Sequence, residues 1–123
     1  MNSFTQLSAI DFPDGSIIAY TRESGVIKLT IEKWDCTQVL IEFYNPLYLF
    51  DTSATEGELG MVKVLDTSTQ IEEMLAANFA GQALEQERLY YKQVDFYLAS
   101  SDSPNLIIIC DAVNVTEVPR DES

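Results

Sequence analysis

Carboxylates are the side chains of this sequence that are numerous enough to do chemistry. The chain holds 20 aspartates and glutamates against seven lysines and arginines, and it contains no histidine. Without histidine, Ser-His-Asp and Cys-His catalysis and histidine-containing zinc sites are excluded. What remains is a carboxylate pair of the glycosidase type or a metal site made of oxygen ligands. No spacing of the carboxylates specifies either one, so we predict no catalytic residue, no metal site and no cofactor.

The net charge of −13 is the strongest compositional signal. Such a charge repels nucleic-acid phosphates and anionic membrane surfaces, which disfavours direct binding to DNA, RNA or a membrane. It attracts a basic protein, whose association is then accelerated by electrostatic steering. The alternative interpretation is that the acidity only keeps a small protein in solution.

The length of 123 residues fits one domain with a hydrophobic core of its own. We predict a single globular domain over residues 1–118 and a frayed tail over 119–123. The first ten residues show no basic segment followed by an apolar stretch, and no apolar run approaches the roughly 20 residues of a membrane span. The sequence therefore predicts a cytoplasmic protein.

Cys36 and Cys110 are the two cysteines, and their spacing resembles neither a metal knuckle nor a redox pair. We expect two free thiols. A disulfide between them stays open, because it depends on whether the turn at Cys36 lies over the C-terminal strand.

Two consecutive segments between Gly25 and Phe50 alternate between apolar and polar residues with a period of two. The apolar positions are Ile27, Leu29 and Ile31 in the first segment and Val39, Ile41 and Phe43 in the second. β-Branched and aromatic residues with this period are typical of half-buried strands. Together with a strand expected over residues 17–22, they predict a meander of three antiparallel strands.

The rest of the chain predicts further strands. Pro46 cannot donate a ladder hydrogen bond, so residues 47–50 are expected to form a short edge strand. Strands are also expected at 59–66 and 94–98, and residues 106–109 form the continuous apolar run typical of a strand buried on both faces. Asp111 interrupts this run, which indicates a bulge or the rim of the sheet.

One helix is predicted over residues 69–80. Thr69 followed by Glu72 fits a capping box, and Gly81 is a suitable stop. The apolar residues of the segment fall on one face, which we expect to pack on the sheet. The predicted fold class is therefore α+β and mainly β, with an antiparallel meander sheet of about six to eight strands and one packed helix.

Aromatic residues within an acidic rim are typical of a protein interface. The candidate aromatics are Trp34, Tyr44, Tyr48, Tyr90, Tyr91 and Tyr97. The candidate rim is Asp51, Glu56, Glu58, Glu85 and Glu87. In the alternative interpretation the tyrosines form cross-strand pairs on the outer faces of strands, and Trp34 covers the core with its ring. The sequence predicts a mobile acidic loop over residues 51–58. The composition of this segment is the hardest in the chain to attribute to packing in the folded protein.

Several segments resemble small β-rich immunity-type proteins of bacterial toxin systems. They are the Asp14-Gly15 turn, Leu29-Thr30-Ile31-Glu32-Lys33-Trp34, Val39-Leu40-Ile41-Glu42-Phe43-Tyr44-Asn45-Pro46, Asp95-Phe96-Tyr97-Leu98 and Ile107-Ile108-Ile109-Cys110-Asp111-Ala112. The resemblance implies a cytoplasmic protein that binds and neutralises a toxin, often a basic nuclease, through an acidic surface.

The sequence as a whole predicts a non-enzymatic binding protein that presents acidic and aromatic residues to a basic protein partner. Two alternatives stay open. One is a small-ligand-binding or carboxylate-using enzyme domain, with its site between sheet and helix. The other is a structural homo-oligomer that pairs through the edge strand at residues 47–50.

Overall fold

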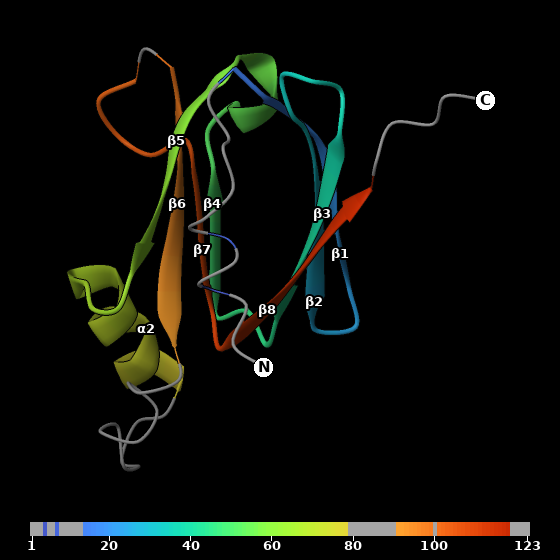
Figure 1. Cartoon of the computed structure of the whole chain (residues 1–123). Coiled ribbons are helices and arrows are strands. Elements are labelled where there is room, and N and C mark those ends of the chain that lie inside the picture. The colour runs from blue at the N-terminus through green and yellow to red at the C-terminus, as the bar shows by residue number, and fades with distance from the viewer. Residues whose placement is uncertain (1–3, 5–6, 8–13, 79–90, 100, 119–123) are drawn as a thin grey trace.

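The computed structural model describes residues 4, 7, 14–78, 91–99 and 101–118. Its strands form two antiparallel sheets of four strands, which pack face to face (Figure 1). The first sheet holds, in spatial order, β1 (Ser16–Glu23), β2 (Val26–Glu32), β3 (Gln38–Tyr44) and β8 (Ala112–Val118). The second holds β4 (Tyr48–Asp51), β7 (Leu106–Cys110), β6 (Lys92–Leu98) and β5 (Leu59–Leu65). The predicted class, α+β and mainly β, is confirmed, with the strands divided between two sheets.

The first sheet contains the predicted meander. β1, β2 and β3 pair in sequence order, and β8 adds to the free side of β3. Buried and accessible residues alternate along β2 and β3, as the period of two predicts. One face of this sheet therefore contributes to the core, and the other is accessible to solvent.

The second sheet contains the predicted edge strand and the strands expected at residues 59–66, 94–98 and 106–109. β4 lies at its edge and is four residues long. β6 and β7 pair with each other, and every residue of β7 is buried. The continuous apolar run therefore marks a strand with cover on both faces, as expected.

The main core lies between the two sheets. Residues of β2 and β3 meet residues of β6 and β7, and Phe43 contacts Phe96 edge to face with ring centroids 6.3 Å apart. Two residues of the N-terminal segment, Phe4 and Leu7, also belong to this core. The two sheets are thus held together mainly by apolar burial.

The chain passes from one sheet to the other at the same end of the sandwich twice. Asn45 follows β3 and Asp111 follows β7, and the Asn45 Nδ2 donates to both Asp111 carboxylate oxygens at 3.0 and 3.2 Å. Asn45 adopts a φ of 52°, which Asn tolerates better than most residues. Asp111 thus stands at the rim of the sheets, and its carboxylate joins the two crossings.

Helix α2 (Thr69–Asn78) packs on the outer face of the second sheet, as predicted. Ile71 and Leu75 of the helix meet Ile109 of β7 in a second, smaller core. The predicted cap is wrong by one residue: the Ser68 hydroxyl accepts a hydrogen bond from the Ile71 N–H at 2.9 Å. The predicted stop at Gly81 lies outside the described residues. Among the described helices, none has the length and apolar character needed to cross a membrane.

Residues 51–58 lie over one end of the sandwich, and most of their described side chains are exposed. They contain the short 3₁₀ helix η1 (Ala54–Glu56), and Ala54 is buried in the main core. The Ala54 N–H donates to the Asp51 carboxylate at 2.9 Å, which fixes the start of this turn. η1 thus covers the end of the sandwich at the top of Figure 1.

Candidate functional site

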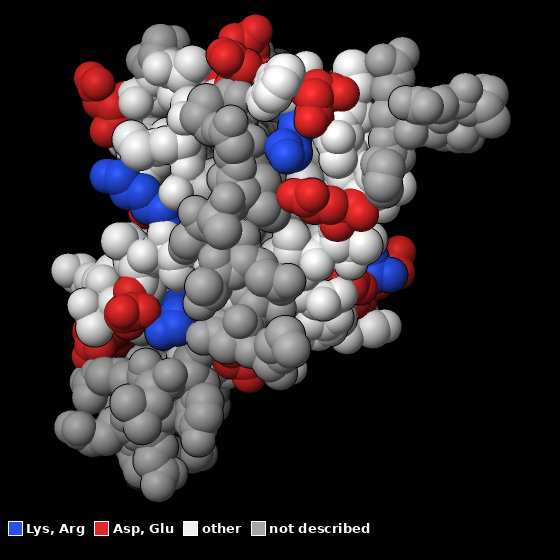
Figure 2. All heavy atoms as spheres, viewed as in Figure 1, with Lys and Arg blue, Asp and Glu red and all other residues white. Residues whose placement is uncertain are grey.

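One end of the sandwich gathers carboxylates from segments that are far apart in sequence. This acidic end is formed by Asp14, Glu32, Asp35, Asp51, Glu58, Asp102 and Glu117. Strand pairing brings these segments together, because Ser16 is the partner of both Glu32 and Glu58. Figure 2 shows acidic side chains along this upper part of the molecule. The acidic end therefore carries a concentrated negative charge.

Trp34 stands at the tip of the β2–β3 hairpin, within the acidic end. The Cys36 N–H donates to the Lys33 carbonyl at 2.9 Å, and the Lys33 N–H donates to the Thr37 carbonyl at 2.8 Å. Trp34 and Asp35 are therefore the central residues of a tight turn, whose side chains project outwards. Trp34 is 64% exposed. The alternative in which its ring covers the core is thus wrong.

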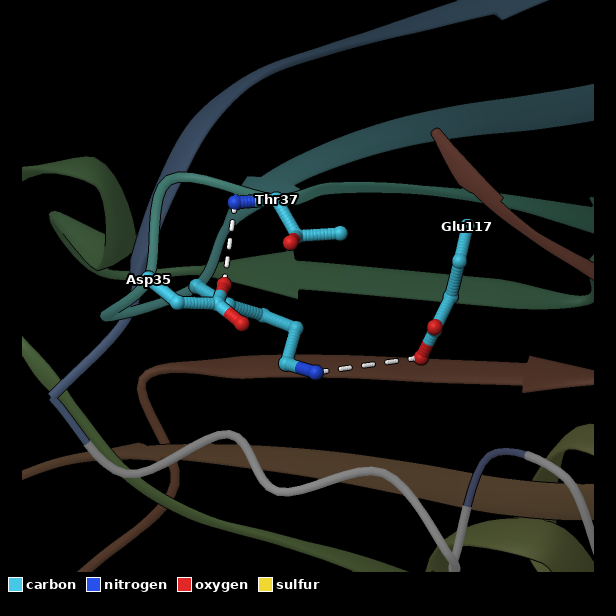
Figure 3. Close-up of polar contacts among 4 residues, drawn as sticks. Asp35, Thr37 and Glu117 are labelled. Atoms are coloured by element: carbon cyan, nitrogen blue, oxygen red, sulfur yellow. Dashed lines mark hydrogen bonds and ion pairs between the residues drawn. The ribbon is translucent and has the colours of Figure 1, made fainter. Parts of the chain in front are cut away.

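Cys36 occupies a position of this turn that favours glycine. Its φ is 70°, in the left-handed region, where a residue with a Cβ carries backbone strain. Asp35 compensates by accepting a hydrogen bond from the Thr37 N–H at 3.0 Å (Figure 3). The turn that presents Trp34 is therefore fixed by backbone and side-chain hydrogen bonds together.

The charges around Trp34 are predominantly negative. The backbone N–H and hydroxyl of Thr37 lower the pKa of Asp35, so this exposed side chain remains a carboxylate. Lys33 is the basic residue described at this end, and its Nζ lies 3.9 Å from the Glu117 carboxylate (Figure 3). The tip of the hairpin thus combines an exposed indole with carboxylates, while its lysine is paired within the chain.

Asp51, one of the predicted binding residues, forms hydrogen bonds within the chain at the acidic end. The Tyr20 hydroxyl of β1 donates to the Asp51 Oδ2 at 2.5 Å and thereby joins the edges of the two sheets. This hydrogen bond, with burial and the negative charge of Asp51, raises the pKa of Tyr20 to about 12. Asp51 contributes its charge to the acidic end, but its oxygens are engaged by Tyr20 and Ala54.

Of the other predicted rim residues, Glu58 is exposed at the acidic end. It lies next to β1, because residues 14 and 15 pair with Leu59 through backbone hydrogen bonds. The backbone of Glu56 belongs to η1, and its side chain lies outside what the structure describes. Glu85, Glu87 and Tyr90 also fall outside the described residues.

The described members of the predicted aromatic patch do not share one surface, which corrects the sequence prediction for these residues. Tyr44 ends β3 at the end of the sandwich opposite to the hairpin tip, and Tyr48 packs on the α2 core together with buried Tyr91. β3 has seven residues. At about 3.3 Å per residue this separates Trp34 from Tyr44 by roughly 20 Å or more. Trp34 is therefore the aromatic residue of the original set that stands at the tip of the acidic end. Tyr97 lies near this end, opposite Met61 in the β5–β6 pairing, and its ring centroid is 5.2 Å from the Lys63 Nζ.

Sequence reasoning missed five carboxylates of the acidic end: Asp14, Glu32, Asp35, Asp102 and Glu117. Alternating strand direction in the meander was a signal for Glu32 and Asp35, because the end of β2 and the start of β3 must lie together. Glu117 and Asp102 depend on pairings between distant strands, which no local pattern specifies.

The other chemistry-bearing groups of the described residues do not converge on a second site. Within the described residues, no group of three or more Cys, Asp or Glu side chains is placed to hold a metal ion. Cys36 is exposed and Cys110 is buried, and both are free thiols, as expected. Comparison of the chain with known protein families, with curated proteins and with solved structures finds no match.

Proposed function

We propose that this protein is a non-enzymatic binding protein that recognises a basic protein partner through its acidic end. The observation that carries the proposal is Trp34, which is 64% exposed on a hydrogen-bonded hairpin tip among carboxylates. Exposure of a large aromatic side chain to water has no benefit for folding, whereas such residues dominate the energetics of interfaces.

The partner that fits this surface presents arginine or lysine side chains. A cationic side chain stacks on the face of an indole, and neighbouring carboxylates accept its hydrogen bonds. The net charge of −13 adds long-range attraction, which accelerates association. The resemblance to immunity-type proteins gives the proposal a concrete form, in which the basic partner is a toxin that this protein neutralises.

The test is capture of partners from the lysate of the source organism with tagged protein at low and at high salt, followed by affinity measurement with the captured partner. We expect a basic protein that is retained at low salt and released at high salt, because screening weakens the attraction. Trp34→Ala is expected to weaken binding by roughly tenfold or more, as truncation of an aromatic anchor does. Because Trp34 is exposed, the fold should be unaffected.

A matched pair of variants separates the acidic end from net charge. Asp14→Asn with Glu58→Gln removes two carboxylates at the acidic end, and Asn tolerates the φ of 68° at position 14. Glu23→Gln with Glu73→Gln removes two exposed carboxylates elsewhere. We expect the first pair to lower the association rate several-fold and the second to lower it much less. Equal effects, or no basic partner with any bait, would contradict the proposal.

A further inference from the structure

The four edge strands of the sandwich differ in how they are protected against pairing with another chain. β1 has a bulge between Ile17 and Ala19, and β5 has a bulge between Leu59 and Met61 and an exposed lysine at position 63. β4 is four residues long and follows Pro46. Bulges, lysine, proline and brevity are the devices that protect edge strands. β8 has seven residues and a regular register with β3, and the strand itself contains no bulge, lysine or proline, although Pro119 follows it directly in the sequence.

Hydrogen-bond alternation shows which backbone groups of β8 point away from β3. The Lys33 N–H donates to the Thr37 carbonyl, and the Asn45 N–H donates to the Gly25 carbonyl. These two bonds join residues that lie opposite each other at the two ends of the β2–β3 ladder. Every second pair of an antiparallel ladder is hydrogen-bonded, so between β2 and β3 these pairs are Ile27–Phe43, Leu29–Ile41 and Ile31–Val39. The alternate residues of β3 therefore direct their N–H and C=O groups to Ala112, Asn114, Thr116 and Val118 of β8. The backbone groups of Val113, Val115 and Glu117 point outwards, and none of the described strands pairs with them.

We infer that β8 pairs with β8 of a second copy of this chain, antiparallel and about a two-fold axis at Val115. This register makes Val115 opposite its own copy and Val113 opposite Glu117 of the copy, and each of these pairs exchanges both N–H···O bonds. It is the one register that uses all the outward backbone groups. The two sheets then join into one continuous sheet across the dimer. This inference goes beyond the proposed function, which it neither needs nor supports.

Charge favours a second copy as the occupant of this edge. Glu117 is the only ionisable residue of β8, and Lys33 of the same chain lies 3.9 Å from it, so the edge offers little net charge to a charged partner. In the inferred register Glu117 faces a valine of the copy instead of another carboxylate. Antiparallel pairing also directs the acidic ends of the two copies in opposite directions, which limits the repulsion between two chains of charge −13.

The inference replaces the edge that the sequence predicted for self-association. Residues 47–50 do contribute to an edge strand, but β4 is too short and too close to Pro46 to pair strongly. β8 gains more from pairing, because half-buried Val115 also extends the core across the two-fold axis.

The test compares two double variants by sedimentation equilibrium. In the inferred dimer residue 114 lies opposite residue 116 of the copy, on the exposed outer face. Asn114→Lys with Thr116→Lys places like charges opposite each other, and Asn114→Lys with Thr116→Glu places opposite charges there. In both variants the new lysine at 114 lies beside Glu42, which now accepts a hydrogen bond from Asn114 at 3.0 Å. The double lysine variant is expected to have a dissociation constant roughly tenfold or more above that of the lysine–glutamate variant.

Net charge alone would have the opposite effect on the two variants. The double lysine variant is the less negative of the two, so its copies would repel each other less and dimerise more strongly. Stronger association of that variant would therefore overturn the inferred register. Wild-type protein is expected to dimerise more strongly as salt rises, since screening reduces repulsion, whereas binding of a basic partner weakens with salt. A wild-type chain that stays monomeric at all salt concentrations up to about 1 mM protein would overturn the inference and leave the proposed function intact.

Val115→Pro gives an independent measurement. The Val115 N–H points outwards, so proline at this position removes no hydrogen bond to β3, and edge strands tolerate proline in this orientation. We expect a folded monomer by circular dichroism and sedimentation. A folded variant that still dimerises like the wild type would place the contact on another surface and overturn the inference. If this variant does not fold, the two charge variants still decide the outcome.

Discussion

The outer faces of the two sheets are built from similar strands but meet different surroundings. On the first sheet, the outward residues of β2 are Val26, Lys28, Thr30 and Glu32, and all of them are accessible to solvent. On the second sheet, the outward residues Gln93, Asp95, Ile107 and Ile109 are buried. The first face is open and polar, whereas α2 packs on the second. The comparison shows that a polar residue at an outward position of a strand is hydrated or buried depending on whether another element packs on that face.

Gln93 and Asp95 show how the covered face accommodates polar groups. The Ser68 hydroxyl donates to the Gln93 Oε1 at 2.6 Å, and the Gln93 Nε2 donates to the Asp95 Oδ1 at 2.8 Å. Ser68 also caps α2. The start of the helix is therefore tied to the buried carboxyl of the sheet by a continuous set of hydrogen bonds, which reduces the cost of burying these groups.

The largest change in the free energy of unfolding is expected from a substitution between α2 and the covered face. Leu75→Ala removes a fully buried side chain from the small core beneath the helix and is expected to lower the free energy of unfolding by about 2–5 kcal/mol. Leu40→Ala on the open face, where the side chain is half-buried, is expected to cost about 1 kcal/mol or less. Urea unfolding followed by circular dichroism measures both. Equal losses would show that the two faces do not differ in packing.

The second effect concerns the cap that joins the helix to the sheet. Ser68→Ala removes the acceptor for the Ile71 N–H and the donor to Gln93, and is expected to cost about 1–2 kcal/mol. Thr69→Ala is the control, because Thr69 is exposed within the first helical turn. It is expected to change the free energy of unfolding by about 0.5 kcal/mol or less. A larger loss for Thr69→Ala would restore the capping box that the sequence predicted.

Local patterns predicted most of the elements, because each depends on residues close in sequence, but they did not predict β8. The alternation in β2 and β3, the apolar run of β7 and the helix after Ser68 are all confirmed. The division into two sheets depends on Asn45 and Asp111, where the chain crosses, and on the pairing of β8 with β3. These contacts join residues far apart in sequence, so no local pattern of apolar and polar residues predicts them.

The candidate site was predictable only in part for the same reason. Trp34 and Glu58 were singled out by residue type, and the structure does place both at the acidic end. Tyr44 and Tyr48 were grouped with them, although strand direction sends these tyrosines to the opposite end. The engagement of Asp51 by Tyr20 could not be foreseen, because it needs the edges of two sheets to meet.

The smallest effect, and the one most specific to the covered face, is the pH dependence that Asp95 confers. Burial raises the pKa of Asp95, although the hydrogen bond from Gln93 and the charge of Lys63 oppose this shift. The folded state therefore holds the Asp95 proton more tightly than the unfolded chain does. Consequently this group makes the protein less stable as the pH rises from the ordinary carboxyl range through the raised pKa.

Asp95→Asn removes the buried charge while keeping an oxygen that accepts the Gln93 hydrogen bond. We expect the variant to unfold a few degrees above the wild type at pH 7, and the difference to shrink as the pH falls below the ordinary carboxyl range. Glu42→Gln on the open face is the control, and its effect on the unfolding midpoint should be smaller. Thermal unfolding from pH 3 to pH 8 measures these differences. A variant that is less stable than the wild type at pH 7 would contradict this expectation. It would show that the attraction of Lys63 for the Asp95 carboxylate outweighs the cost of burying that carboxylate on the covered face.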